Sequence, residues 1–242
     1  MMPEPNTLIN EPNPEILWCM ENFDLFKHLS MLEMERLRQR VKTMKYKRGE
    51  IIYLPGDPGD TVYFLKRGKV KLDYLDASGR RLTLKICHRG EPFGEAALVG
   101  EDSRKLIAEA HDNVELCAIA KDDLLQFAEG NTSLSLRISK LIGLRLVELE
   151  NRLEDLFFKD VPTRLSRLLL KLGNDFGVDA DDGIEIKMKI THQDMADLIG
   201  SRRETTSVVL GEFEDEGLIE KGHGHIWLKD LAGLKAKAQL LD

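Results

Sequence analysis

The stretch that decides the fold runs from residue 191 to residue 219 and reads THQDMADLIGSRRETTSVVLGEFEDEGLI. Thr191 offers a hydroxyl that can cap a helix, and an acid follows three residues later at Asp194. The helix so begun ends at Gly200, a residue suited to a left-handed cap. A second helix follows after a short turn. Helix, glycine-bearing turn and helix form a unit whose second helix enters the major groove of DNA.

The second helix is predicted to run from near Arg202 to Gly217, with hydrogen-bonding and charged side chains at its start. We predict that its inward residues are Thr205, Val208, Val209 and Phe213, and that Val209, Leu210 and Ile219 belong to the core. The residues predicted to contact DNA lie at the starts of the two helices: Thr191, His192, Ser201, Arg202, Arg203, Glu204 and Ser207. An arginine can bond a guanine edge with two hydrogen bonds, and a carboxylate can accept from the cytosine amino group. The first two of these residues are placed for phosphate contact at a helix N-terminus. The alternative is a solvated charge cluster, which the surrounding helix-turn-helix pattern disfavours.

A hairpin follows the second helix. Leu218–Lys221 and His225–Leu228 are predicted strands separated by a turn at residues 222–224. Such a hairpin is the wing of a winged helix. We interpret His223 and His225 as residues of this wing rather than as metal ligands.

Ahead of this unit, short strands alternate with glycine-bearing turns. Residues 13–41 show a helical pattern with Leu25, Phe26 and Leu29 on one face. Strands are predicted over 51–54, 62–65, 70–75, 82–86, 114–119 and 184–188, with a hairpin turn at 76–79 and an acidic turn at 179–183. Closely spaced short strands before residue 120 are typical of an antiparallel barrel or sandwich.

Residues 133–158 contain no proline and only one glycine, which favours one long helix. Five apolar residues fall at alternating spacings of four and three, as in the seam of a coiled coil: Ile142, Leu146, Leu149, Leu153 and Leu156. The alternative is a helix packed on its own barrel. At ~1.5 Å per residue the helix is ~40 Å long, more than a small barrel covers, so a second subunit is the better partner.

The sequence therefore predicts an α+β protein in three parts. An N-terminal antiparallel β-roll occupies 13–130, a coiled-coil dimerisation helix 131–159, and a winged-helix DNA-binding domain 160–242. Asp160 and Pro162 mark the start of the third part, because proline suits the first turn of a helix.

The overall composition limits the class of protein. The 242 residues are 42% hydrophobic and 32% charged, as in ordinary globular proteins, and the net charge is −7. An acidic chain that binds DNA must do so through a local favourable potential. No apolar run reaches the ~18 residues of a membrane span and no secretory signal is readable, so we expect a cytoplasmic protein without membrane contact. Cys19, Cys87 and Cys117 form neither a disulfide framework nor a zinc pattern.

The stretch 191–219 resembles the helix-turn-helix of the cyclic-AMP receptor protein/FNR family of bacterial transcription regulators. The order of a glycine-punctuated roll, a long helix, a hinge at 158–161 and a winged helix is similar too, over about residues 20–235. The resemblance implies a homodimer on an inverted repeat, with half-sites one DNA turn apart, and an activator that contacts RNA polymerase. Arg203 and Glu204 match the family's base-reading arginine and glutamate, whereas Val208 stands where the cyclic-AMP receptor has a further base-reading arginine.

The resemblance also implies an effector cassette at residues 92–98. Gly94, Glu95, Ala96 and Ala97, with Arg104 as the phosphate partner, match the cassette of cyclic-nucleotide domains. Four residues depart from the pattern that binds cyclic AMP: Lys105, Leu106, Leu149 and Glu150. We therefore do not expect cyclic AMP as the effector. The alternative is that these residues form only a turn of the roll and bind no effector.

Other sensing and catalytic chemistries lack support. One N-terminal Cys19 cannot hold an iron–sulfur cluster. Cys87 and His88 are adjacent on a strand and point to opposite faces, so no haem or other metal site is expected, and Cys87 and Cys117 are predicted core thiols. No nucleophile–base constellation is present, so we predict no enzyme. The remaining rival is a cyclic-nucleotide-type ligand-binding module that acts through protein contacts, which would have no need of a winged helix.

Overall fold

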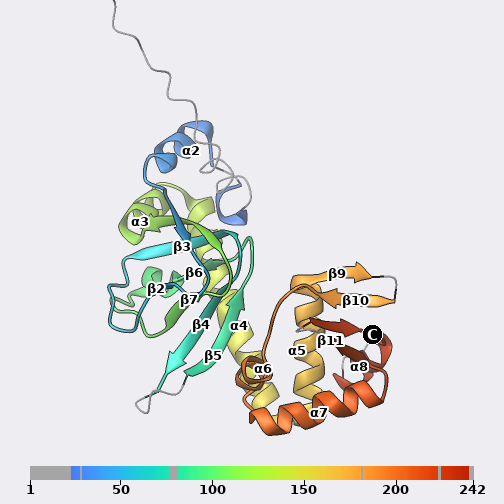
Figure 1. Cartoon of the computed structure of the whole chain (residues 1–242). Helices are drawn as coiled ribbons and strands as arrows, with labels where there is room; N and C mark the ends of the chain where they lie inside the picture. The colour runs from blue at the N-terminus through green and yellow to red at the C-terminus, as the bar shows by residue number, and fades with distance from the viewer. Residues whose placement is uncertain (1–22, 28, 77–80, 181, 223–224, 240–242) are drawn as a thin grey trace, which may run out of the picture.

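The structure is a computed structural model that describes residues 23–27, 29–76, 81–180, 182–222 and 225–239. A β-roll precedes one long helix, and a winged helix follows it (Figure 1). Several predicted features lie outside the described residues: the helical pattern over 13–22, Cys19, most of the hairpin turn at 76–79, and the wing residues 223–224.

The roll is built from two four-stranded antiparallel sheets, with the orders β1-β8-β3-β6 and β2-β7-β4-β5. The strands are β1 (Lys42–Tyr46), β2 (Ile51–Tyr53), β3 (Thr61–Arg67), β4 (Val70–Leu75), β5 (Arg81–Cys87), β6 (Pro92–Phe93), β7 (Ile107–Ala110) and β8 (Val114–Ala120). The five predicted strands of this region are confirmed. The sequence did not predict β1, β6 and β7, of which β6 has only two residues.

Short helices cover one end of the roll: η1 (Asp24–Phe26), α2 (Met31–Arg38) and α3 (Lys121–Glu129). Within the described residues, the helical pattern predicted up to residue 41 corresponds to η1 and α2, and the helix ends at Arg38. Ser30 starts α2 through a capping box, in which Glu33 Oε2 accepts from the Ser30 amide at 2.7 Å. Phe26 packs on Phe64 with ring centroids 5.0 Å apart, and this contact docks η1 on the roll.

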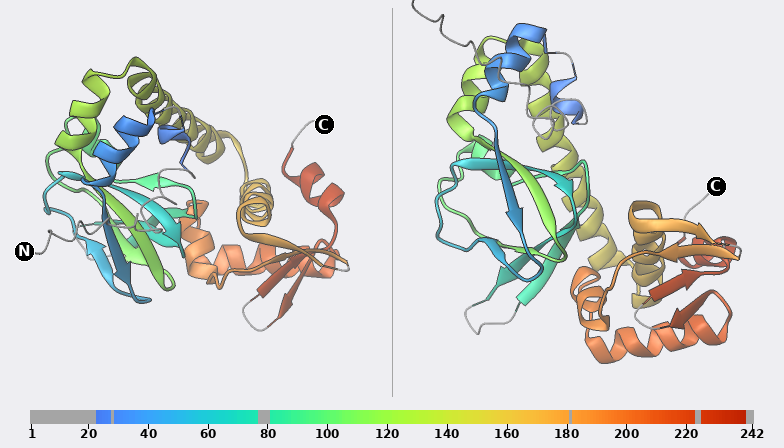
Figure 2. Two further views of the ribbon diagram at one scale, coloured as in Figure 1. Left: turned by 90° about the horizontal axis from the view of Figure 1, so that it is seen from above. Right: turned by 45° about the horizontal axis from the view of Figure 1, so that its top comes forward.

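The long helix α4 (Thr132–Phe158) runs from beside α3 to the C-terminal domain (Figures 1 and 2). The Asn131 side chain caps its start by accepting from the Leu134 amide at 2.9 Å. Lys159 is extended and Asp160 caps the next helix, so these two residues form the hinge.

The C-terminal domain is a winged helix around a sheet of order β11-β12-β10-β9. Its elements are α5 (Val161–Phe176), β9 (Gly177–Ala180), β10 (Gly183–Ile186), α6 (His192–Leu198), α7 (Arg203–Asp215), β11 (Ile219–Gly222), β12 (His225–Leu228) and α8 (Leu231–Lys237). The predicted acidic turn is shorter than expected, because Asp179 belongs to β9 and pairs with Ile184. Ile86 of β5 is buried with the core of this domain, so the roll and the winged helix pack on each other.

The two cysteines within the described residues differ. Cys87 is a free and fully buried thiol, and burial raises its pKa to about 12. Cys117 is disulfide-bonded, so its prediction as a core thiol is wrong. Spacing along a chain does not reveal which distant cysteines the fold brings within bonding distance.

Candidate nucleic-acid interface and effector cassette

The turn between α6 and α7 is tight. Gly200 has φ +62°, and the amide of Ser201 donates to the carbonyl of Ala196 at 2.8 Å. A Cβ on Gly200 would lie 2.5 Å from the Cδ2 atom of Leu156, on the dimerisation helix. Both the backbone conformation and this close approach of α4 require glycine here.

The predicted capping pair at the start of α6 is confirmed. The Thr191 hydroxyl accepts from the Asp194 amide at 3.0 Å, and the Asp194 carboxylate accepts from the Thr191 amide at 3.1 Å. Lys71 of β4 approaches the same carboxylate at 3.2 Å. Burial alone would raise the pKa of Asp194, but the bonds from Thr191 and the Lys71 ammonium lower it overall. The acid that caps the helix thus also joins it to the roll.

The predicted inward face of α7 is confirmed at Val209, Leu210 and Phe213 and is wrong at two residues. The buried face holds Thr206, Val209, Leu210 and Phe213. Thr205 and Val208, predicted to point inward, are exposed, and Val208 is 61% exposed. Arg202 is the N-cap, so α7 begins at Arg203. The face of α7 opposite the core therefore carries Val208 together with Glu204, one of the predicted DNA-contacting residues.

Of the seven predicted DNA-contacting residues, Thr191, Arg202, Arg203 and Glu204 are exposed, and the other three are half-buried. Arg202, Arg203 and Glu204 are exposed at the start of α7, and Ser201 is half-buried in the turn before it. Among the described residues, none forms an ion pair with Arg202 or Arg203.

His192 and Ser207 join the two helices. His192 Nδ1 lies 2.8 Å from Ser207 Oγ, so the two predicted contacts act as a pair. Burial and the neighbouring cations Lys221 and Arg203 lower the pKa of His192, which favours a neutral ring at pH 7. The ring can then donate one hydrogen bond to a phosphate but brings no charge.

The effector cassette is formed, and its two polar side chains are bonded within the chain. Gly94, with φ +75°, precedes the short helix η2 (Glu95–Val99), which contains Ala96 and the buried Ala97. Arg104 is 4% exposed; its guanidinium donates to the carbonyls of Gly94 and Thr61. The same guanidinium lies 4.7 Å from the ring centroid of Tyr53.

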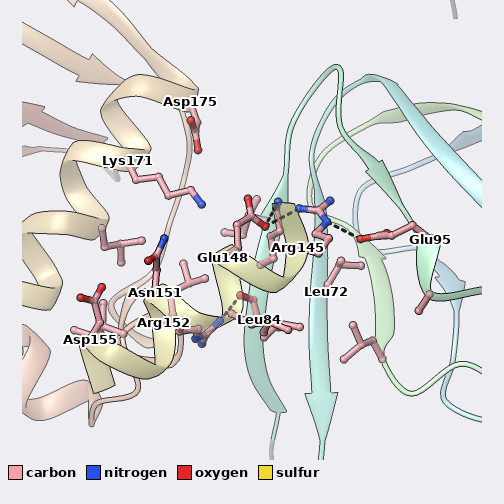
Figure 3. Close-up of a pocket in the computed structure, with 18 of the residues that line it drawn as sticks. Leu72, Leu84, Glu95, Arg145, Glu148, Asn151, Arg152, Asp155, Lys171 and Asp175 are labelled. Atoms are coloured by element: carbon pink, nitrogen blue, oxygen red, sulfur yellow. Dashed lines mark hydrogen bonds and ion pairs between the residues drawn. The ribbon is translucent and has the colours of Figure 1, made fainter. Parts of the chain in front are cut away.

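Glu95 pairs with a residue that sequence reasoning missed. Its Oε1 atom accepts from Arg145 Nε of α4 at 2.6 Å, and Arg145 also donates to Glu148 and to the carbonyl of Pro92 (Figure 3). The only sequence signal was an arginine within a leucine-rich helix. A cleft of about 560 Å³ extends from the cassette along α4 to α5.

The predicted seam lies on the open surface of α4. Leu146, Leu149, Leu153 and Leu156 are between 40% and 57% exposed, and Ile142 is half-buried. Among the described helices, none is long and apolar enough to cross a membrane.

An exposed recognition helix, a wing and a roll with a cyclic-nucleotide-type cassette define a transcription regulator of the helix-turn-helix class. A family model for a Crp-like helix-turn-helix domain matches residues 163–237, and one for a cyclic nucleotide-binding domain matches residues 43–131. The global nitrogen regulator of Synechocystis sp. is 35% identical over 176 residues, 72% of this chain and 78% of that protein. The transcriptional regulator SdrP of Thermus thermophilus is 34% identical over 82% of this chain and 95% of that protein.

Solved structures agree. A transcriptional regulator of the CRP/FNR family from Thermus thermophilus superposes with a TM-score of 0.67 at 34% identity, covering 82% of this chain and 98% of that one. The chain belongs to the CRP/FNR family of transcriptional regulators. It is a DNA-binding regulator and not an enzyme, and the match to the helix-turn-helix model decides against a module that acts through protein contacts alone.

Proposed function

We propose that the protein binds an inverted-repeat DNA sequence as a homodimer, and that Arg203 and Glu204 read bases in the major groove of each half-site. The observation that carries this proposal is the start of α7, where the side chains of Arg203 and Glu204 are both exposed. An arginine bonds guanine O6 and N7, and a carboxylate accepts from cytosine N4. Thr191 and the paired His192 and Ser207 contact the flanking phosphates.

The homodimer is supported by the apolar stripe on α4, which one copy alone leaves in water. Leu153 is 54% exposed on the seam, and Leu144 is 54% exposed outside the predicted seam. Leu153→Asp places a charge in the interface and is expected to give monomers in analytical ultracentrifugation. Leu144→Asp is the matched control and stays dimeric. Equal dissociation by both substitutions, or by neither, contradicts a dimer built on this seam.

DNA binding without a cyclic nucleotide is the second part of the proposal. A cyclic phosphate would need Arg104, which already donates to two carbonyls, and a ribose hydroxyl would need Glu95, which Arg145 neutralises. We therefore expect cyclic AMP at millimolar concentration to leave the affinity for operator DNA unchanged within twofold. A large gain in affinity would mean that the ligand displaces these bonds.

The family resemblance supports activation through contact with RNA polymerase as the outcome of DNA binding. Transcription in vitro from a promoter that carries the operator upstream tests this part, with increased transcript expected and decreased transcript pointing to repression.

The experiment that tests the central proposal is selection of bound sequences from a random duplex pool, with purified full-length protein and no added small molecule. We expect enrichment of one inverted repeat. An enriched site without twofold symmetry would refute the homodimer on DNA. If no sequence is enriched, the selection is repeated with a panel of nucleotides; enrichment only when a nucleotide is present would refute DNA binding without an effector.

A further inference from the structure

The C-terminal end of α6, the first helix of the helix-turn-helix, receives arginines from two other helices. Arg164 of α5 donates to the carbonyls of Ile199 and Gly200. Arg152 of α4 donates to the carbonyl of Asp197 at 3.3 Å. The last carbonyls of a helix have no partner within it and carry partial negative charge, which explains why two cations gather there.

Arg152 differs from Arg164 in what else it bonds. Its guanidinium also donates to the carbonyls of Leu84 and Thr83 on β5 (Figure 3). One side chain thus joins three elements: the dimerisation helix, a strand of the roll and the helix-turn-helix. Arg164, by contrast, joins α5 to α6 within the winged helix alone.

The role of Arg152 is geometric rather than that of an ion pair. Among the described residues, none places a carboxylate within ion-pairing distance of it, and its hydrogen bonds go to backbone carbonyls. Burial lowers its pKa without a compensating acid. A planar guanidinium with donors on two edges can hold two backbones at once, which a lysine ammonium at the end of a flexible chain does less well.

The contacts of Arg152 link the helix that carries the dimer interface to the helices that bind DNA. The dimer axis lies along α4, whereas the recognition helix α7 moves with α6. Covalently, only the extended hinge at Lys159 and Asp160 connects the two parts. Leu156, one turn after Arg152, touches the turn at Gly200, so the end of α4 lies directly against the helix-turn-helix.

We propose that Arg152 is a positioning residue that fixes the rotation of the helix-turn-helix about α4 and thereby sets the spacing between the two half-sites that the dimer accepts. This inference rests on the proposed function. One extra base pair moves a half-site by about 3.4 Å and rotates it by about 35° around the duplex. A connection that Arg152 holds between α4 and α6 rejects such a shift. The links that remain without it, which are the hinge, the Lys71–Asp194 pair and the Arg167–Asp155 pair, tolerate it better.

The test compares spacer preference in wild type, Arg152→Leu, Arg152→Lys and Arg164→Leu. Each full-length dimer is offered a duplex pool in which the two half-sites are constant and the spacer varies in length. For wild type we expect one spacer to bind about tenfold better than spacers one base pair longer or shorter. For Arg152→Leu and Arg152→Lys we expect this preference to fall below about threefold, with affinity for the best spacer nearly unchanged.

Arg164→Leu is the matched control, because it removes a guanidinium from the same helix end without cutting the link to α4. We expect it to lower the stability of the winged helix in thermal unfolding and to keep the wild-type spacer preference. Arg152→Leu with the wild-type preference overturns the inference. So does Arg152→Lys with full preference, because charge at the end of α6 would then suffice. If wild type binds none of these duplexes better than random DNA, the proposed function has failed. That result differs from strong binding with an unaltered spacer preference, which overturns this inference alone.

Discussion

The substitution Arg203→Ala tests base reading most directly, because it should weaken DNA binding while leaving the stability of the fold almost unchanged. Arg203 is exposed at the start of α7, and among the described residues none forms a hydrogen bond or an ion pair with its side chain. Its loss should change the free energy of unfolding by less than about 0.5 kcal/mol. A bidentate contact with guanine contributes about 1–3 kcal/mol for each half-site. Two symmetric half-sites lose about 2–6 kcal/mol together, a decrease in affinity between about 30-fold and about 10⁴-fold.

Fluorescence anisotropy measures the affinity of both proteins for the selected operator, for operators changed at one base pair, and for a random duplex. We expect Arg203→Ala to lose most of its preference at one base pair of each half-site while its affinity for random DNA falls much less. Lys235→Ala, at an exposed lysine of α8, removes one positive charge elsewhere and controls for net charge. An equal loss on operator and random DNA would refute the base-reading role and leave a phosphate contact.

Three further substitutions test other parts of the structure. Glu95→Gln breaks a partly buried ion pair with α4 and should lower the free energy of unfolding by about 1–3 kcal/mol in urea titrations, with no recovery on adding cyclic AMP. Because the pKa of Asp194 is lowered in the folded state, its ion pair with Lys71 stabilises the protein above the unfolded pKa of ~3.9 and loses this effect as the pH falls through the folded value. The difference in stability between wild type and Asp194→Asn should therefore be present at pH 7 and shrink progressively as the pH falls below ~4; a difference that stays constant would assign it to packing. Val208 is exposed beside the base-reading residues, where a valine can contact a thymine methyl group, so Val208→Arg should change the preferred base at one position in each selected half-site, and an unchanged selection would place it outside the groove.

The winged helix was predictable because its signals are local. The pairing of Thr191 with Asp194 and the left-handed Gly200 each occupy a few residues, and the structure contains both. The predicted inward face of α7 was wrong at two residues because the burial of Thr206 depends on the helix start at Arg203, which sequence places only approximately. Thr206 is also a residue type that is mostly exposed, so its burial carried no signal.

The connections between domains were not predictable, because they join residues far apart in the chain. Arg145 and Arg152 fill positions between the seam leucines, where charged residues are expected on a coiled coil. Arg145 lies 50 residues from Glu95, and Arg152 lies 68 residues from Leu84. No periodicity or cap relates such pairs, and only the fold brings them together.

The acidic net charge of −7 agrees with DNA binding once the charges are located. Arg202 and Arg203 stand at the positive end of the α7 dipole, whereas the exposed Glu212 and Glu214 lie on its last two turns. On α7, attraction to phosphate is therefore strongest at the N-terminal end, and the net charge of the whole chain does not add to it. Non-specific binding of such a protein should be weak, because that binding depends on the number of phosphates neutralised. Specific binding then depends on base contacts and on the orientation of α7, which makes the attachment of α6 to the dimerisation helix as important to recognition as the residues that face the bases.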